Sequence, residues 1–251
     1  MPERYFQTGA ERATRVRRLF DRIAPRYDLI NDLQSFGLHR YWKRRVIELA
    51  KVNAGSGALD VCCGTGDLAE ALSRAGAKVV GCDFSPEMLR VAKERQPKID
   101  YLQADALQLP FKDAHFDTVT IGYGLRNLAD LQKGISELLR VLKGDAVLII
   151  LEFGKPANRL WRALYFFYLR LFVPILGLLF CGDAAAYRYI LDSLREYPAQ
   201  EGISAILREQ GCDTVELYSF LGGVMSIHRA TKAKLLRQRD DVPLAARHFV
   251  G

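Results

Sequence analysis

The sequence predicts an α/β protein built on a parallel, doubly wound sheet, and three observations support this prediction. Between residues 58 and 154, short apolar runs alternate with segments of helical periodicity, a pattern typical of strand–helix–strand units. The run AVLIILEF, 146–153, is apolar with β-branched residues, as expected of a strand buried on both faces. The first strand also leads directly into a glycine turn, GTGD at 64–67.

The elements can be placed in order along the chain. Two amphipathic helices are expected at 12–24 and 39–51, before any strand, because apolar positions recur there at helical spacing among basic residues. The expected strands are 58–63, 78–83, 99–105, 116–124, 146–154, 214–220 and 224–230. The first helix between these strands is expected to follow the glycine turn and to end at residue 75. Further helices are expected at 85–96, 130–142 and 200–210. The helix at 85–96 has Ser85 as its N-cap and Pro86 at its first position, which are common start signals.

The alternation stops at 155–199, and this interruption contains the apolar block LYFFYLRLFVPILGLLFCGD, 164–183. A membrane-spanning helix needs about 20 predominantly apolar residues, but Arg170 interrupts the block, and Pro174 and Gly177 lie in the remaining run. Proline inside a helix kinks or breaks it. We therefore expect broken amphipathic helices that form an apolar lid, inserted between strands five and six. A dimer interface is the alternative.

The chain divides into five segments. Residues 1–52 are the basic amphipathic helices, expected to form part of a substrate cover, and residues 53–154 are the Rossmann-like core that would bind a cofactor. Residues 155–199 are the lid insertion, residues 200–231 complete the sheet, and residues 232–251 form a basic tail that is expected to be flexible.

Basic residues outnumber acidic ones, which gives a net charge of +7, and they cluster at 12–26, 40–45 and 232–239. Such clusters suit phosphate groups or anionic lipid headgroups, with a solvated basic face as the alternative. No nucleic-acid-binding motif accompanies them, so no nucleic-acid partner is expected.

The N-terminal residues contain no apolar segment of a signal peptide, so a cytoplasmic location is expected. The five cysteines should then stay reduced. None of them forms a CxxC pair and the four histidines are scattered, so no metal site is expected.

The loop after the first strand gives the clearest cofactor signal. Gly64 and Gly66 allow a ligand to approach the backbone closely, because neither carries a Cβ atom. Together with Ala69 they also satisfy the dinucleotide pattern G-x-G-x-x-A. This pattern alone does not separate a dinucleotide from another adenosine-containing cofactor.

Carboxylates at three successive strands help to distinguish between a dinucleotide and another adenosine-containing cofactor. Asp60, in the first strand, would oppose a pyrophosphate but attract an amino group or a sulfonium. Asp83 ends the second strand, where an acid binds ribose hydroxyls, and Asp105 follows the third strand, where it can accept from an adenine amino group. The set favours S-adenosylmethionine over NAD, although each acid by itself is also a common helix cap or turn residue.

Two stretches carry more specific patterns than the glycine loop. YDLINDLQSFGLHRYWK, 27–43, contains Tyr-Asp-x-x-Asn…Ser…His-x-x-Trp, and RVLKGDAVLIILEFGKP, 140–156, contains Arg-Val-Leu-Lys…Leu-Glu-Phe. Both resemble signatures of the ubiquinone/menaquinone biosynthesis C-methyltransferase family. GYGLRN (122–127) and AYRYILDSLREYPAQE (186–201) also resemble family segments, so the resemblance covers about residues 20–230. It implies a Rossmann-like class I methyltransferase fold with S-adenosylmethionine as the cofactor.

The resemblance assigns cofactor contacts to residues at or after strand ends: Thr65, Asp83, Asp105, Ala106 and Gly122. Asp60, Gly64 and Gly66 are already expected to contact the cofactor from the strand and loop pattern described above. Two departures from the family pattern are a Gly-Asp-Ala turn at 144–146 in place of Pro-Gly-Gly, and Gly122 in place of a frequent serine. The second departure leaves only a backbone contact to the cofactor at Gly122.

The resemblance also implies methylation of a ring carbon of a polyprenylated quinol. Demethylmenaquinol to menaquinol is the favoured reaction, and methylation of the benzoquinol of the ubiquinone pathway, alone or in addition, is the alternative. A methyltransferase for another lipid, an NAD-dependent reductase and a non-enzymatic cofactor-binding scaffold are less favoured. With such a substrate, the lid would hold the isoprenoid tail. The protein would also contact an anionic membrane surface peripherally. A homodimer is the other partner that we consider.

The quinol ring needs a base or a cation beside its hydroxyl. Arg126, followed by Asn127 at the end of the fourth strand, could stabilise a phenolate, with a structural ion pair as the alternative. His39 is a candidate base, or else a histidine that anchors the N-terminal helices. Tyr27 and Asn31 belong to the same signature and could line the ring site.

Overall fold

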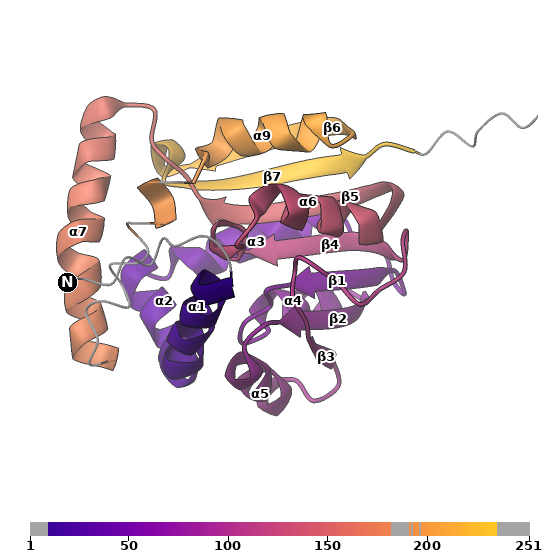
Figure 1. Ribbon diagram of the computed structural model, residues 1–251, viewed down its shortest axis with the longest axis horizontal. Coiled ribbons are helices and arrows are strands. Elements are labelled where there is room, and N and C mark those ends of the chain that lie inside the picture. Colours follow the sequence, from indigo (N-terminus) through magenta and orange to yellow (C-terminus); the bar gives the residue numbers. More distant parts are fainter. Residues whose placement is uncertain (1–9, 182–190, 192, 196, 235–251) are drawn as a thin grey trace, which may run out of the picture.

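The computed structural model describes residues 10–181, 191, 193–195 and 197–234, and it confirms the predicted α/β fold (Figure 1). A seven-stranded sheet has the order β3-β2-β1-β4-β5-β7-β6. Its strands are β1 (Gly57–Val61), β2 (Lys78–Asp83), β3 (Asp100–Gln103), β4 (Phe116–Gly122), β5 (Leu142–Phe153), β6 (Cys212–Phe220) and β7 (Met225–Lys232). The first five strands pair in parallel, so their carboxyl ends lie at one edge.

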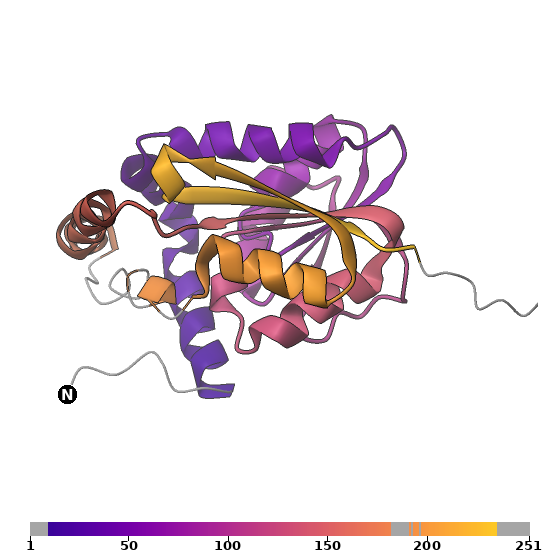
Figure 2. The same cartoon turned by 90° about the horizontal axis from the view of Figure 1, so that it is seen from above.

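Helices cover both faces of the sheet, as a doubly wound topology requires. One face carries α3 (Leu38–Ala50), α4 (Asp67–Arg74) and α5 (Pro86–Arg95), and the other carries α6 (Leu131–Val141) and α9 (Ala199–Glu209) (Figure 2). Each face therefore has its own apolar core against the buried strands. The predicted N-cap of α5 is confirmed, because the side chain of Ser85 accepts the backbone N–H of Met88.

The last strand departs from a parallel sheet. β7 pairs antiparallel with both β5 and β6. Only the short turn Leu221–Gly223 and Val224 separate β6 from β7, and a connection of this length can join only antiparallel neighbours. The expectation of a parallel sheet is thus wrong at this edge.

The region before β1 contains one helix more than expected. The structure has α1 (Ala10–Ile23), the 3₁₀ turn Ala24–Arg26, α2 (Tyr27–Ser35) and then α3. α2 was missed because its polar residues mask the apolar spacing of its short sequence, YDLINDLQS. It ends at Phe36 and Gly37, both with positive φ, which reverses the chain into α3.

The described part of the apolar block, 164–181, lies in one helix, α7 (Arg159–Cys181), with Pro174 inside it. The expectation of broken helices is therefore wrong. Pro174 removes the hydrogen bond to the carbonyl of Arg170, but Arg170 is exposed, so water can satisfy that carbonyl. In Figure 1, α7 stands at the edge of the molecule, beside α2 and away from the sheet. No described helix is long and apolar enough to cross a bilayer.

The predicted flexible tail lies outside the described residues from 235 onward, as do parts of the family-like segment 186–201. Within the described residues, a third apolar cluster joins the N-terminal helices to α7 through side chains that include Leu19, Ile30, Tyr165 and Leu169. This cluster holds the cover over the carboxyl edge of the sheet, where the candidate site lies.

Candidate active site

The loop between β1 and α4 adopts a conformation that its glycines make possible. Gly64 has φ of 55° and Gly66 has φ of 85°, in the left-handed region. A Cβ atom on Gly66 would also lie 2.5 Å from the hydroxyl oxygen of Tyr101. The loop therefore packs closely against Tyr101 of β3, and packing as well as φ favours glycine at position 66.

Asp83 ends β2 and faces this loop. Its Oδ2 accepts the backbone N–H of Gly64 at 2.9 Å, and its Oδ1 accepts that of Ser85 at 2.8 Å. Burial raises the pKa of Asp83, and these backbone donors oppose the increase. Each oxygen keeps a second lone pair, so the carboxylate can still accept hydroxyl donors from a ligand.

Asp60 is buried in β1, with 1% of its surface exposed. Its Oδ1 accepts the hydroxyl of Thr120 at 2.7 Å, while its Oδ2 is buried without a hydrogen-bond partner among the described residues. Burial raises the pKa of Asp60 to about 7, and the hydrogen bond from Thr120 opposes this. A nearby cation would therefore favour the charged form of Asp60.

A cavity of about 110 Å³ lies at the ends of β1, β2 and β4. Five of the predicted cofactor residues line it: Gly64, Asp83, Asp105, Ala106 and Gly122. Three of the predicted residues do not: Asp60, Thr65 and Gly66. We call it the cofactor cavity. Helix α1 closes it, because Ser85 donates a hydrogen bond to Asp21 at 2.6 Å and Arg17 stacks over Phe84.

A second cavity, of about 450 Å³, lies between α1, α2, α3 and α7 and is mostly apolar. We call it the apolar cavity. Four of the predicted catalytic residues line it: Tyr27, Asn31, His39 and Arg126. The fifth, Asn127, lines the cofactor cavity instead, while Tyr27 and Tyr123 line both cavities. The two cavities therefore adjoin at these tyrosines.

Arg126 follows β4 and forms a buried ion pair with Glu152 of β5. Its Nε lies 3.7 Å from Glu152 Oε1, and its backbone N–H donates to Oε2 at 3.1 Å. The guanidinium also lies 4.9 Å from the centre of the Phe153 ring. Glu152 was not singled out from the sequence, although an acid inside the apolar run AVLIILEF is a usable signal. Both alternatives for Arg126 are compatible with this geometry, since the paired side chain also reaches the cavity.

Tyr27 is a hydrogen-bond donor rather than a base at neutral pH. Burial raises its pKa to about 12, although contact with Asn31 and the charge of Arg126 oppose the increase. The phenol therefore keeps its proton where the two cavities meet.

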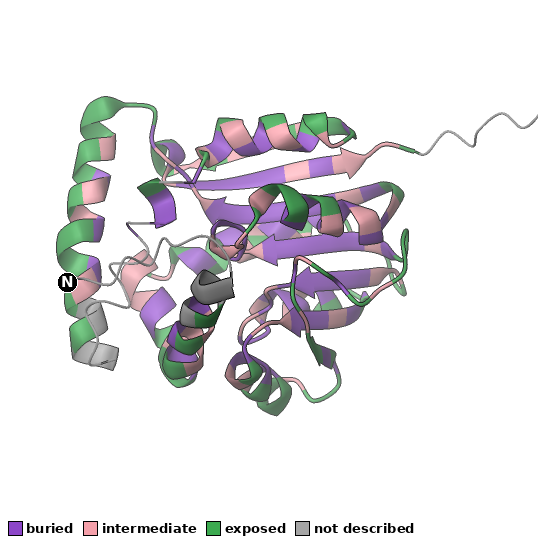
Figure 3. Cartoon of the chain, in the orientation of Figure 1, coloured by how far each residue is buried: buried purple, intermediate pink, exposed green. Residues whose placement is uncertain are grey.

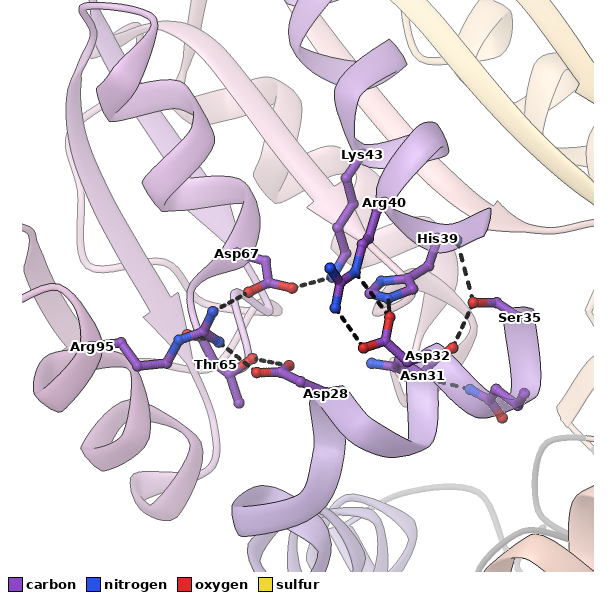
Figure 4. A network of polar contacts seen from close by, with 11 residues as sticks. Asp28, Asn31, Asp32, Ser35, His39, Arg40, Lys43, Thr65, Asp67 and Arg95 are labelled. Atoms are coloured by element: carbon purple, nitrogen blue, oxygen red, sulfur yellow. Dashed lines mark hydrogen bonds and ion pairs between the residues drawn. The ribbon is translucent and has the colours of Figure 1, made fainter. Parts of the chain in front are cut away.

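His39 forms a pair with Asp32, which the sequence did not indicate. His39 Nε2 lies 2.8 Å from Asp32 Oδ1, and Arg40 binds both oxygens of the same carboxylate (Figure 4). Hydrogen bonds from Arg40 and His39 lower the pKa of Asp32 to about 2. Burial lowers the pKa of His39, with Asp32 opposing. Because Asp32 stays ionised, Nε2 carries the proton and Nδ1 is the free acceptor of a neutral imidazole.

Ion pairs tie the N-terminal helices to the glycine loop. Asp28 of α2 accepts the hydroxyl of Thr65 at 2.8 Å and pairs with Arg95 at 2.6 Å. Arg95 also pairs with Asp67, which in turn binds Lys43 of α3 (Figure 4). Thr65, which was predicted to contact the cofactor, thus donates a hydrogen bond to Asp28 of the N-terminal helices. The two residues are far apart in the chain, so the sequence did not indicate this contact.

We expect Asp60→Asn to stabilise the cofactor-free protein at high pH. A carboxyl whose folded pKa of about 7 exceeds its usual 3.8 holds its proton more tightly in the folded state. The free energy of unfolding of the wild type should therefore fall as pH rises between these values. Asparagine cannot ionise, so the variant should exceed the wild type by roughly 2–4 kcal/mol at pH 8 and by much less at pH 5. Urea unfolding at both pH values measures this, and a pH-independent difference would contradict it.

Comparison with known proteins identifies relatives over nearly the whole chain. The model of the ubiE/COQ5 methyltransferase family matches residues 8–232. The ubiquinone/menaquinone biosynthesis C-methyltransferase UbiE of Pseudomonas putida is 41% identical over 232 residues, which cover 89% of this chain and 91% of that protein. A demethylmenaquinone methyltransferase of Paenarthrobacter aurescens is 39% identical over 235 residues, covering 94% and 92%.

A solved structure shares the fold at low identity. Phosphoethanolamine N-methyltransferase 2 of Haemonchus contortus, in complex with S-adenosyl-L-methionine, has a TM-score of 0.59 and 18% identity, covering 77% of this chain and 53% of that chain. The sequence-based prediction of a methyltransferase is confirmed by the family match, and the solved structure confirms the fold. The chain belongs to the ubiE/COQ5 methyltransferase family.

Proposed function

We propose that this protein methylates a ring carbon of a polyprenylated quinol, converting demethylmenaquinol to menaquinol. The observation that carries the proposal is the apolar cavity of about 450 Å³, which has Arg126 and His39 in its wall and adjoins the cofactor cavity. A quinol needs such a combination, because its ring carries ionisable hydroxyls and its tail is hydrocarbon. The names of the two relatives, which refer to quinone biosynthesis, support the same substrate class.

The residues of the cofactor cavity fit S-adenosylmethionine. Asp83 and Asp105 offer carboxylate oxygens, and Gly64 offers a backbone without a side chain. At Gly122, a Cβ atom would lie 2.8 Å from Leu68 Cδ1, so any larger residue there would require Leu68 to shift. The volume of about 110 Å³ is below the roughly 300 Å³ of typical ligand pockets, so a shift of α1 would accompany binding. When bound, the cofactor supplies a methyl group that its sulfonium makes electrophilic.

His39 is proposed as the general base. Its Nδ1 is buried without a hydrogen-bond partner among the described residues, and the residue lines the apolar cavity. Removal of the hydroxyl proton makes the ring carbon nucleophilic, and this carbon releases its own proton after methylation, which restores the aromatic ring. The ion pair of Asp32 with Arg40 holds the imidazole in the tautomer that can accept a proton.

Arg126 is proposed to stabilise the phenolate that forms on proton removal. Tyr27, with its retained proton, can donate to the same oxygen or hold the ring, and Asn31 contributes a polar wall. Asn127 donates to the carbonyl of Tyr123 at 3.2 Å and lies 3.4 Å from Arg126, so it is proposed to position that side chain.

The benzoquinol of the ubiquinone pathway is the second candidate substrate, because the name of the Pseudomonas putida relative covers both pathways. Peripheral contact with an anionic membrane surface and a homodimer stay predictions for the partners of this protein.

Purified protein with each demethylated quinol and labelled S-adenosylmethionine tests the substrate. We expect a kcat/KM at least about tenfold higher for the naphthoquinol, because a buried fused ring changes the fit of a pocket by this order or more. The reverse preference would establish the benzoquinol instead, and no methylation of either would overturn the proposal. S-Adenosylhomocysteine should raise the melting temperature by mass action while NADH should not.

Replacing the Arg126–Glu152 pair tests the proposed role of the cation. Arg126→Ala alone leaves a buried, unpaired carboxylate, which costs roughly 3–5 kcal/mol of stability. The double variant Arg126→Gln with Glu152→Gln avoids this charge. We expect it to bind the cofactor normally in calorimetry but to lose about 100-fold or more in kcat. Wild-type kcat in the folded double variant would remove Arg126 from the mechanism.

The pH dependence of kcat tests His39 and Asp32. A base acts only when deprotonated, so kcat should rise with pH around a midpoint below 6.5, because burial lowers the pKa of His39. Asp32→Asn removes the charge that favours the imidazolium, so the midpoint should move to lower pH. His39→Gln should abolish this limb and lower kcat by about 10²–10⁴. If kcat of His39→Gln still rises with pH around the same midpoint, another group is the base.

A further inference from the structure

The apolar cavity has an exposed apolar rim. Side chains from three elements both line the cavity and are exposed: Phe36 and Leu38 at the α2–α3 junction, Trp161, Leu164 and Phe167 on α7, and Leu221 in the β6–β7 turn. Trp161 donates its indole N–H to the carbonyl of Leu221 at 2.8 Å, and the rings of Phe36 and Tyr168 lie 6.5 Å apart. The three elements are therefore in contact and surround one opening.

The rim continues into a stripe along α7. Exposed apolar residues recur there every three or four positions, on one side of the helix: Leu160, Leu164, Phe167, Leu171, Ile175 and Leu178. Each of them is at least 45% exposed, and Figure 3 shows the outward edge of α7 as exposed along its described length. The inward side buries Tyr165, Leu169 and Val173. A water-soluble monomer rarely exposes a continuous apolar surface of this kind without a partner.

The charges around the stripe favour an anionic partner. Between residues 155 and 181 the chain contains Lys155, Arg159, Arg162 and Arg170 and no acidic residue. Arg44 is exposed on α3, which contributes to the same cavity. A helix with an apolar face and basic residues lies in the plane of an anionic lipid surface. A second copy of this chain fits less well, because a two-fold contact through α7 would face basic residues with basic residues.

We infer that the α7 stripe and the cavity rim dock on an anionic lipid bilayer, so that a quinol enters the apolar cavity directly from the membrane. This inference rests on the proposed polyprenylated quinol substrate. The helix lies in the interface without crossing the bilayer, and the opening between Phe36, Trp161 and Leu221 faces the acyl chains. The isoprenoid tail then need not pass through water while the ring reaches Arg126 and His39.

Vesicle flotation tests the docking surface. The full chain should float with vesicles of phosphatidylglycerol and phosphatidylcholine, and less with phosphatidylcholine alone or at high salt. The triple variant Leu160→Ser, Leu171→Ser, Ile175→Ser changes exposed residues that do not line the cavity. We expect it to lose more than about tenfold in vesicle affinity. Arg159→Gln and Arg170→Gln should each cost roughly fivefold. Leu102→Ser, at an exposed leucine on the edge strand β3, is the matched control.

Activity gives the second readout. The triple variant should methylate a short-tailed, water-soluble quinol at the wild-type rate, but methylate a long-tailed quinol in vesicles more slowly, in proportion to its lost binding. Flotation of the triple variant like the wild type would overturn the docking surface. The docking surface would also be overturned if the wild type sediments as a dimer, the triple variant sediments as a monomer, and both float equally with vesicles. A wild type that floats but methylates no quinol would instead defeat the proposed function and leave the docking surface standing.

Discussion

The buried ion pair between Arg126 and Glu152 is the interaction on which the rest of the site depends. Glu152 is fully buried in β5 and accepts the backbone N–H of Arg126, so it fixes the turn after β4 against the neighbouring strand. A charge in such surroundings is tolerated only with a partner. The pair therefore keeps a cation at the inner end of a cavity whose walls are otherwise mostly apolar.

The N-terminal helices are built into the site rather than attached to it. Tyr27 belongs to both cavities, and Asp28, one residue later, binds the glycine loop through Thr65. Further pairs from Asp67 to Lys43 and Arg95 join α3, α4 and α5. These links join the cover to the cofactor loop at several points.

Helix α7 meets two requirements with one sequence. Its inward side packs on α2 and closes the apolar cavity, and Tyr168 donates to the carbonyl of Gln34 at 2.9 Å. Its outward side stays apolar and exposed, which costs solubility unless something covers it. The proposed polyprenylated substrate and the proposed docking on a bilayer would together account for a helix that is apolar on both sides.

The sequence by itself determined the local parts of this protein. The β1–loop–α4 unit, the carboxylates at the strand ends and the cap at Ser85 were predictable, because they depend on neighbouring residues and on the shared direction of parallel strands. Tertiary structure decided which distant side chains meet: Glu152 with Arg126, Asp32 with His39, and Asp28 with Thr65. It also decided the antiparallel β7, because only four residues separate that strand from β6, and the continuous α7. Pairing and packing energies arise between segments far apart in the chain, so no local pattern contains them.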